Sequence, residues 1–217
     1  MKRTVYVSAE ADGRLLTYLR STGADVVCVE PTEEVYGAIN THPDIRMCAV
    51  TERILVRARP GELGRVYPES AAFCALCLDR YFIHNLKITE PRLLDAAREA
   101  GKTLVDVKQG YARCSSAAVD GRSVITADPG IAAALEKLGD VDVLTVTPGR
   151  VLLTGFDHGF IGGASGRVGD ELVFSGDLSA HPDCAAIVKF AEERGVRLKY
   201  FPEFPLTDIG SIIEITE

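Results

Sequence analysis

The chain repeats one pattern of apolar and polar positions, an amphipathic stretch of helical period followed by a glycine and then by a short apolar run. The pattern occurs four times, at residues 12–29, 91–107, 129–146 and 182–201. Because glycine readily adopts the left-handed conformation that ends a helix, each copy predicts a helix that stops at its glycine and leads into a β-strand. Proline opens three of these helices, where its fixed φ suits the first turn.

A second pattern precedes the helices, namely two apolar runs separated by a short polar turn, which is typical of a β-hairpin. It is found at residues 50–56, 78–83, 119–125 and 168–174. The two patterns combine into a unit of strand, turn, strand, helix and strand. Complete copies of this unit cover residues 72–107, 113–147 and 163–201.

Two further copies of the unit are partial. Residues 46–58 form a hairpin that runs into a loop rich in glycine and proline, and residues 4–30 lack the leading strand, which the apolar run 211–215 can supply. Five units joined head to tail leave no long exposed strand edge, so we predict a single α/β domain over residues 1–217. Its architecture is a five-unit ββαβ propeller, whose ring is closed by pairing of the C-terminal strand with the N-terminal strand 4–8.

Composition and charge narrow the function. Hydrophobic residues make up 47% and charged residues 25%, as in typical soluble globular proteins. The net charge of -7 includes no block of like charge, so we expect no nucleic-acid partner and no membrane partner. Because no apolar run is long enough for a signal peptide or a membrane span, we expect a cytoplasmic protein.

The cysteines and histidines show no metal-binding pattern in the sequence. Cys74 and Cys77 form the only C-x-x-C pair, inside an apolar run where cysteine packs as a small hydrophobic residue. A zinc site of this type needs a second such pair, and the four histidines lack ligand spacing. We therefore expect no metal and, without a nucleotide-binding glycine loop, no cofactor.

The polar segments just before the inner strands are the predicted location of a site. In a closed ring the first strand of each unit lies nearest the axis, so these leading segments converge on one end of a central channel. They comprise residues 40–44, 67–70, 108–115, 160–164 and 208–211. Such breaks in an apolar pattern are common at functional sites, so we predict a small-molecule ligand in the channel. The oligomeric state is left open.

Two residues are candidates for catalysis from their neighbourhood, His42 as a general base and Cys114 as a nucleophile. The basic neighbour Arg113 favours a lowered thiol pKa at Cys114. Candidates for substrate binding are polar or glycine residues in the same segments, together with Asn85 and Asp177 at the exits of predicted strands. They are Asp44, Asn85, Lys108, Gln109, Tyr111, Gly162, Gly163, Asp177 and Asp208. The two glycines would let a ligand approach the backbone.

Several candidates also have a purely structural interpretation. His42 and Asp44 fit a tight turn, Cys114 fits buried packing, and Lys108 fits a solvated strand end. Asp128 stands just before a proline-opened helix, and we expect it to cap that helix.

The five-unit ring resembles the pentein fold, the α/β propeller of the guanidine-modifying enzymes. Four sequence segments are similar to motifs of a bacterial family of unknown function with that fold. They are residues 107–115, 159–166, 174–183 and 208–213. The resemblance implies a cysteine thiolate that attacks a guanidinium carbon, a histidine that moves protons and carboxylates that hold the cation. Ser211 stands where the C-terminal cysteine of those enzymes would fall, so the resemblance makes Ser211 a third catalytic candidate, as the alternative nucleophile to Cys114.

Two function classes follow. The first is a hydrolase or amidino-transfer enzyme that acts on a small guanidino or amide compound in the central channel. The second is a non-catalytic module that binds a small molecule or a protein, because the resemblance extends to a translation factor with the same ring. A deep central pocket bordered by the leading segments would favour the enzyme.

Overall fold

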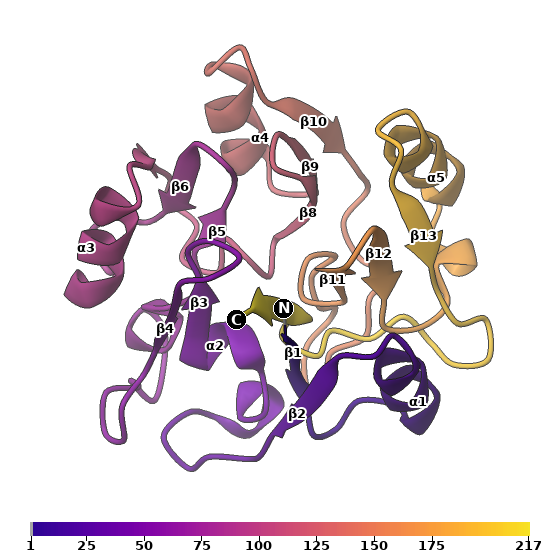
Figure 1. The fold of residues 1–217 in the computed structure, drawn as a ribbon, viewed down its shortest axis with the longest axis horizontal. Coiled ribbons are helices and arrows are strands. Elements are labelled where there is room, and N and C mark those ends of the chain that lie inside the picture. Colours follow the sequence, from indigo (N-terminus) through magenta and orange to yellow (C-terminus); the bar gives the residue numbers. More distant parts are fainter. Residues whose placement is uncertain (1) are drawn as a thin grey trace.

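The computed structural model describes residues 2–217, which form five small β-sheets around a common centre, with the longer helices outside (Figure 1). Three sheets each come from one continuous segment. In each, two strands form an antiparallel hairpin, and a helix then crosses to a third strand that pairs in parallel with the middle one. The elements of these sheets are β5 (Leu76–Cys77), β6 (Tyr81–His84), α3 (Pro91–Glu99) and β7 (Thr103–Asp106); β8 (Ser116–Asp120), β9 (Ser123–Thr126), α4 (Pro129–Glu136) and β10 (Asp142–Thr145); and β11 (Ser165–Val168), β12 (Glu171–Phe174), α5 (Cys184–Glu192) and β13 (Arg197–Lys199).

The other two sheets correspond to the partial units. β3 (Met47–Ala49) and β4 (Leu55–Arg57) form a two-stranded sheet, and the loop after β4 replaces the helix. In the last sheet β1 pairs in parallel with β2 and antiparallel with β14, so β14 takes the place that a hairpin strand has elsewhere. Its elements are β1 (Arg3–Ser8), α1 (Gly13–Ser21), β2 (Asp25–Val29) and β14 (Ile213–Thr216).

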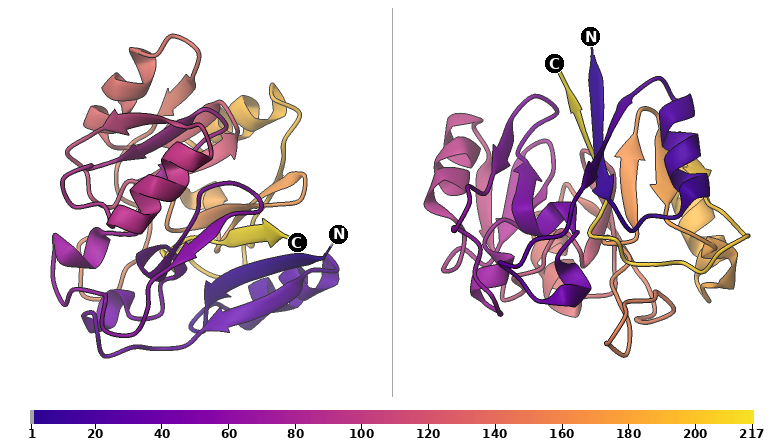
Figure 2. Two further views of the ribbon diagram at one scale, coloured as in Figure 1. Left: turned by 60° about the vertical axis from the view of Figure 1, so that its left-hand side comes forward. Right: turned by 90° about the horizontal axis from the view of Figure 1, so that it is seen from below.

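The two ends of the chain meet in that last sheet (Figure 2). The register runs from Arg3 opposite Thr216 to Tyr6 opposite Ile213. The pairing is the one that the sequence predicts, although β14 begins two residues later than expected, because Ser211 has a φ of 69° and cannot belong to an extended strand. The assignment of this ring to the pentein-like propeller class stays a prediction.

The predicted helix signals are confirmed. Each of the four long helices is followed by a glycine of positive φ, and these are Gly23, Gly101, Gly139 and Gly195. Asp128 caps α4, accepting a hydrogen bond from the Ile131 amide at 2.9 Å. α5 begins at Cys184, two residues after the expected proline.

Short helical turns fill some connections between the sheets. The predicted turn at His42 is the start of a one-turn helix, α2 (Pro43–Arg46), because Pro43 fits a first helical position. Three further turns are of the 3-10 type, at Gly37–Ile39, Glu69–Ala71 and Leu178–Ala180.

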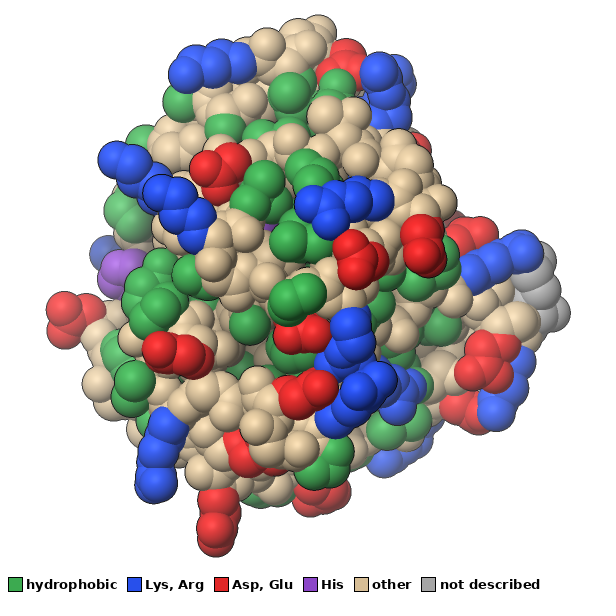
Figure 3. All heavy atoms as spheres, turned by 90° about the vertical axis from the view of Figure 1, so that its left-hand side faces the viewer, with side chains coloured by type: hydrophobic (Ala, Val, Ile, Leu, Met, Phe, Trp, Pro, Cys, Tyr) green, Lys and Arg blue, Asp and Glu red, His purple; other side chains and the backbone are tan. Residues whose placement is uncertain are grey.

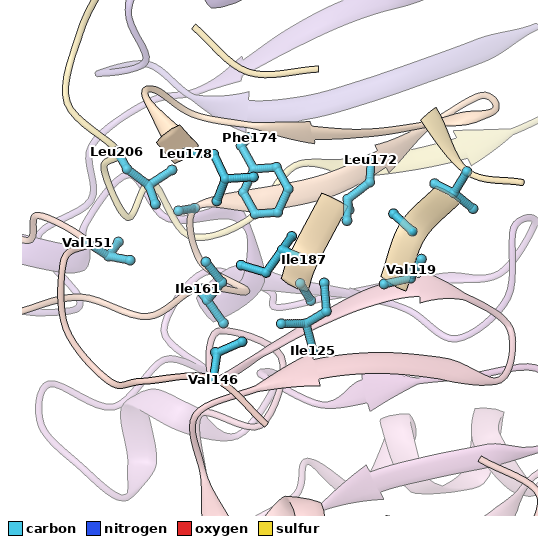
Figure 4. Packing of buried hydrophobic residues seen from close by; sticks show 14 residues of the cluster. Val119, Ile125, Val146, Val151, Ile161, Leu172, Phe174, Leu178, Ile187 and Leu206 are labelled. Atoms are coloured by element: carbon cyan, nitrogen blue, oxygen red, sulfur yellow. The ribbon is translucent and has the colours of Figure 1, made fainter. Parts of the chain in front are cut away.

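Five clusters of buried hydrophobic side chains fill the spaces between neighbouring sheets, one at each junction. In the cluster drawn in Figure 4, Val119 and Ile125 of the β8–β9 hairpin meet Leu172 and Phe174 of β12 and Ile187 of α5. Since burial of one such side chain contributes roughly 1.5–3 kcal/mol, each junction stabilises the two sheets it joins. Every sheet in the described part of the chain therefore has two neighbours.

The surface carries charge of both signs. On the face shown in Figure 3, acidic and basic side chains are interspersed with hydrophobic ones. Within residues 2–217, none of the helices combines the length and the apolar character that crossing a membrane requires.

His84, the last residue of β6, makes a hydrogen bond to the leading segment 108–115. Its Nδ1 lies 2.7 Å from Thr89 Oγ1, and its Nε2 lies 2.6 Å from the Gly110 carbonyl oxygen. The ring is fully buried, and desolvation lowers the pKa of His84 to about 4, although the carbonyl of Gly110 opposes this effect. His84, and not the neighbouring Asn85, is the residue that turns inward here.

We predict that His84 makes the protein less stable in acid. Because the pKa is near 6.5 in the unfolded chain and lower in the folded one, the unfolded state binds the proton first as the pH falls. The contribution is complete above pH 6.5 and declines toward pH 4, by about 2 kcal/mol between pH 7 and pH 5. Urea unfolding of the His84→Gln variant at both pH values is expected to show a smaller pH dependence than wild type. The His158→Gln variant, in an exposed loop, is the control and should keep the wild-type dependence; equal slopes for all three proteins would contradict the prediction.

Candidate functional site

A central cavity of about 640 Å³ is bordered by the inner strands β3, β5, β8, β11 and β14. The prediction that the first strand of each unit lies nearest the axis is therefore confirmed. The cavity wall carries charges of both signs, including Arg113 and Arg167. None of the predicted catalytic or substrate-binding residues lines this cavity, so the expectation that they border the channel is wrong.

Five of the predicted residues meet instead in the interior, at the base of the inner strands. This buried polar cluster consists of His42, Asp44, Cys114, Asp208 and Ser211, each 4% exposed or less. The five come from three leading segments, which precede β3, β8 and β14. The expected convergence of these segments is therefore observed, although the meeting point is closed to solvent.

Backbone hydrogen bonds hold the leading segments together. The Asp44 amide donates to the Gly210 carbonyl at 3.1 Å, and the Gly163 amide donates to the Cys114 carbonyl at 2.8 Å. The Ser211 amide in turn donates to the Gly163 carbonyl at 2.8 Å. Positions far apart in sequence are thereby fixed by main-chain contacts that do not depend on side-chain identity.

The Asp44 carboxylate is the acceptor at the centre of the cluster. Its Oδ2 accepts from the Ser211 hydroxyl at 2.6 Å and from the Cys114 thiol at 2.9 Å. The Ser211 hydroxyl oxygen also lies 3.0 Å from the Gly162 carbonyl. Asp44 Oδ1 is buried and has no hydrogen-bond partner within the described residues.

His42 and Asp208 form a second pair beside Asp44. His42 Nδ1 lies 3.8 Å from Asp208 Oδ1, and this nitrogen has no hydrogen-bond partner in residues 2–217. Asp208 accepts from the backbone amides of Phe160 at 2.9 Å and Gly210 at 3.0 Å. Burial raises the pKa of Asp208, while His42 acts in the opposite direction.

The environment of Cys114 favours the thiol over the thiolate. Burial raises the pKa of the Cys114 thiol well above its ordinary value, and the nearby sulfur of Cys74 and the charge of Asp44 act in the same direction. The expectation that Arg113 lowers this pKa is wrong, because its guanidinium donates to the carbonyls of Ser116 at 3.0 Å and Ser165 at 3.3 Å. Cys114 is therefore not an activated nucleophile in the ligand-free protein.

We predict that Cys114 is alkylated slowly in the native protein. Iodoacetamide reacts with an accessible thiolate, and Cys114 is both buried and protonated. The half-buried Cys28 and Cys184 are expected to react first at neutral pH, as followed by peptide mass mapping. In denaturant all six cysteines should react alike; Cys114 reacting first in the native protein would contradict this environment.

The expectation that Gly162 and Gly163 leave room for a ligand is wrong. The space beside each glycine is filled by protein atoms. A Cβ on Gly162 would lie 2.3 Å from the carbonyl oxygens of Arg113 and Ser116. A Cβ on Gly163 would lie 2.0 Å from Asp208 Oδ1. These glycines let two leading segments pack against the cluster.

We predict that Gly163→Ala destabilises the protein by roughly 1–3 kcal/mol, because the added methyl group displaces the Asp208 carboxylate. Urea unfolding measures the change. The matched control is Gly13→Ala at the start of α1, where a Cβ meets no atom within 4 Å and the change should stay within about 0.5 kcal/mol. Equal stability of both variants would show that Asp208 is not held as described.

The remaining predicted residues have other roles. Tyr111 packs near Cys114, and its hydroxyl lies 2.8 Å from that of Ser70. Gln109 donates to Asp128 at 3.0 Å. Asn85 donates to the backbone carbonyl of Lys108 at 3.2 Å, and the Lys108 side chain is exposed. Asp177 caps the 3-10 turn Leu178–Ala180.

Two features of this region are not predicted by the sequence. Cys74, assigned to core packing, is buried as expected, but its sulfur lies 3.5 Å from that of Cys114. A second cavity of about 180 Å³ lies beside Phe160, with Ser115, Asp128 and His181 in its lining. No local signal reveals either feature, because each depends on contacts between units.

The chain belongs to a family of unknown function (DUF6873), whose model matches residues 59–213. The match includes Cys114, Asp208 and Ser211, whereas His42 and Asp44 precede it. No curated protein matches the sequence.

Proposed function

We propose that the buried polar cluster binds a small cation of the guanidinium or amidinium class, and that the protein is a hydrolase or amidino-transfer enzyme on a pentein-like ring. The observation that carries the proposal is a pair of buried carboxyl groups whose only basic neighbour at salt-bridge distance, within the described residues, is His42 beside Asp208. Within residues 2–217, neither Asp44 nor Asp208 has a lysine or arginine at salt-bridge distance, and both are buried. Buried charge without a partner is costly, and a bound cation would offset that cost.

The donors and acceptors of the cluster suit a planar cation. A guanidinium group presents several N–H donors in one plane, and carboxylates bind it in pairs of hydrogen bonds. Asp44 Oδ1 has a free acceptor position, and Asp208 is fixed nearby by two backbone amides. An amide substrate would use the same acceptors through its NH₂ group.

The reaction that we propose uses Cys114 as the nucleophile. A cation bound beside the thiol would favour the thiolate, which opposes the effect of burial. The sulfur would then form a bond to the central guanidinium carbon, and the thiol proton would pass through Asp44 or His42 to the nitrogen that leaves as ammonia. Water would add to the same carbon and break the carbon–sulfur bond, which gives a ureido product and restores the thiol. Ser211 is the alternative nucleophile, with Asp44 as its base.

A non-catalytic binding module is the second candidate. It is favoured by the raised pKa of Cys114 and by the closure of the cluster to solvent. A module of this kind would bind the same cation without forming a product.

We predict that arginine, agmatine or a related guanidino or amide compound binds the wild-type protein, and that mass spectrometry detects a ureido or carboxylate product. Cys114→Ser should keep binding, measured by calorimetry, but lose turnover, whereas Ser211→Ala should keep turnover but bind more weakly, because it removes a hydrogen bond to Asp44. Asp44→Asn should weaken binding by about 30-fold or more, because it removes a buried charge from the pair. Asp177→Asn is the matched control, since this carboxylate only caps a 3-10 turn.

Loss of turnover in Ser211→Ala alone would move the nucleophile to Ser211. Binding without any product in the wild type would support the binding module. If no compound of either class binds, the proposal fails in both forms.

A further inference from the structure

Three metal-ligating side chains of the buried polar cluster lie close enough to share one ion. One ligand atom each from His42, Asp44 and Cys114 lie within 4.8 Å of one another. With metal–ligand bonds of about 2.0–2.3 Å, the ligand atoms of a tetrahedral zinc site are roughly 3.3–3.8 Å apart, so a small contraction of the cluster completes the geometry. We infer that this triad is a binding site for a single zinc-type transition-metal ion.

Unsatisfied buried atoms point independently to a ligand. Asp44 Oδ1 and His42 Nδ1 are both buried and have no hydrogen-bond partner among the described residues. Native proteins rarely leave such atoms unpaired, because each one loses its hydrogen bonds to water on folding. A cation within the triad would give the carboxylate the missing interaction.

The neighbouring residues resemble the supporting shell of a metal site. The Asp208 carboxylate lies 3.8 Å from His42 Nδ1 and is fixed by the amides of Phe160 and Gly210. Carboxylates commonly orient a metal-ligating histidine by accepting a hydrogen bond from its second ring nitrogen, and the contraction that closes the triad would also have to bring Nδ1 and Asp208 within that distance. The Ser211 hydroxyl, 2.6 Å from Asp44 Oδ2, fixes the orientation of the ligating carboxylate. Asp208 and Ser211 are positioning residues.

The donor set selects the kind of ion. A thiolate, an imidazole and a carboxylate suit zinc and similar borderline-soft ions, whereas magnesium and calcium prefer oxygen ligands alone. On binding, the Cys114 thiol loses its proton to solvent, and the sulfur forms a bond to the ion in place of its hydrogen bond to Asp44. Three protein ligands leave the fourth coordination position for water.

This inference does not rest on the proposed reaction. The ion and a guanidinium group would use the same Asp44 carboxylate and Cys114 sulfur, so only one of them can occupy the cluster at a time. A metal-binding measurement without substrate therefore tests the ion site alone.

The test uses the full chain, freed of metal by a chelator and titrated with cobalt(II) chloride. We expect one cobalt ion per chain and a near-ultraviolet sulfur-to-cobalt charge-transfer band, which zinc chloride abolishes by displacing the cobalt. Cys114→Ser should lose the band. Asp208→Asn should keep the band but bind zinc roughly 10–100-fold more weakly in competition with a chromophoric chelator.

Cys77→Ser is the matched control, because the sulfurs of Cys48 and Cys77 lie 3.7 Å apart and form the other thiol pair that could bind an ion. The band should survive this substitution. Native mass spectrometry of the wild-type protein should show the mass of one zinc ion added and the mass of the protons that the ligands release subtracted. This measurement needs no variant, so it tests the inference even if a variant fails to fold. Absence of the band in the wild type, or its persistence in Cys114→Ser, would overturn the inference.

Discussion

The antiparallel pairing of β14 with β1 is the constraint on which the arrangement of the site depends. It brings the last strand into the sheet that the first strands begin, so that the five sheets form a circle with a hydrophobic cluster at each junction. The segment just before β14 is thereby carried to the base of the inner strands. There Ser211 donates to Asp44, the carboxylate that also accepts from Cys114.

The electrostatic character of the cluster follows from that closure. Two carboxylates, a thiol and a hydroxyl are enclosed by leading segments that pack through glycine. Within residues 2–217, His42 is the only basic side chain at salt-bridge distance from these carboxylates. Such a site is better prepared for a positive ligand than for an anion. A guanidinium group and a metal ion both supply positive charge beside the buried carboxylates. They differ in shape, because only the guanidinium group is planar, and in their use of Cys114, because only the metal ion needs the sulfur as a ligand.

The sequence patterns predict the fold more completely than they predict the site. Helix periods, glycine stops and hairpin turns are local, so the four long helices and the closing pairing could be predicted, whereas the one-turn helix α2 could not. Position just before an inner strand likewise predicts that His42, Cys114 and Ser211 meet. What each side chain touches depends on neighbouring units. Arg113 turns to backbone carbonyls and away from Cys114, and this could not be deduced from their adjacency.

The Gly162 carbonyl oxygen links the central cavity to the buried polar cluster. It lies 3.4 Å from the Arg113 guanidinium, which borders the cavity, and 3.0 Å from the Ser211 hydroxyl, which belongs to the cluster. The same oxygen also accepts from the Ser165 amide at 3.1 Å, so strand β11 is held to it as well. One peptide group is thus in hydrogen-bond contact with the wall of the cavity, with β11 and with the buried polar cluster, so a shift of this peptide would displace an acceptor shared by all three.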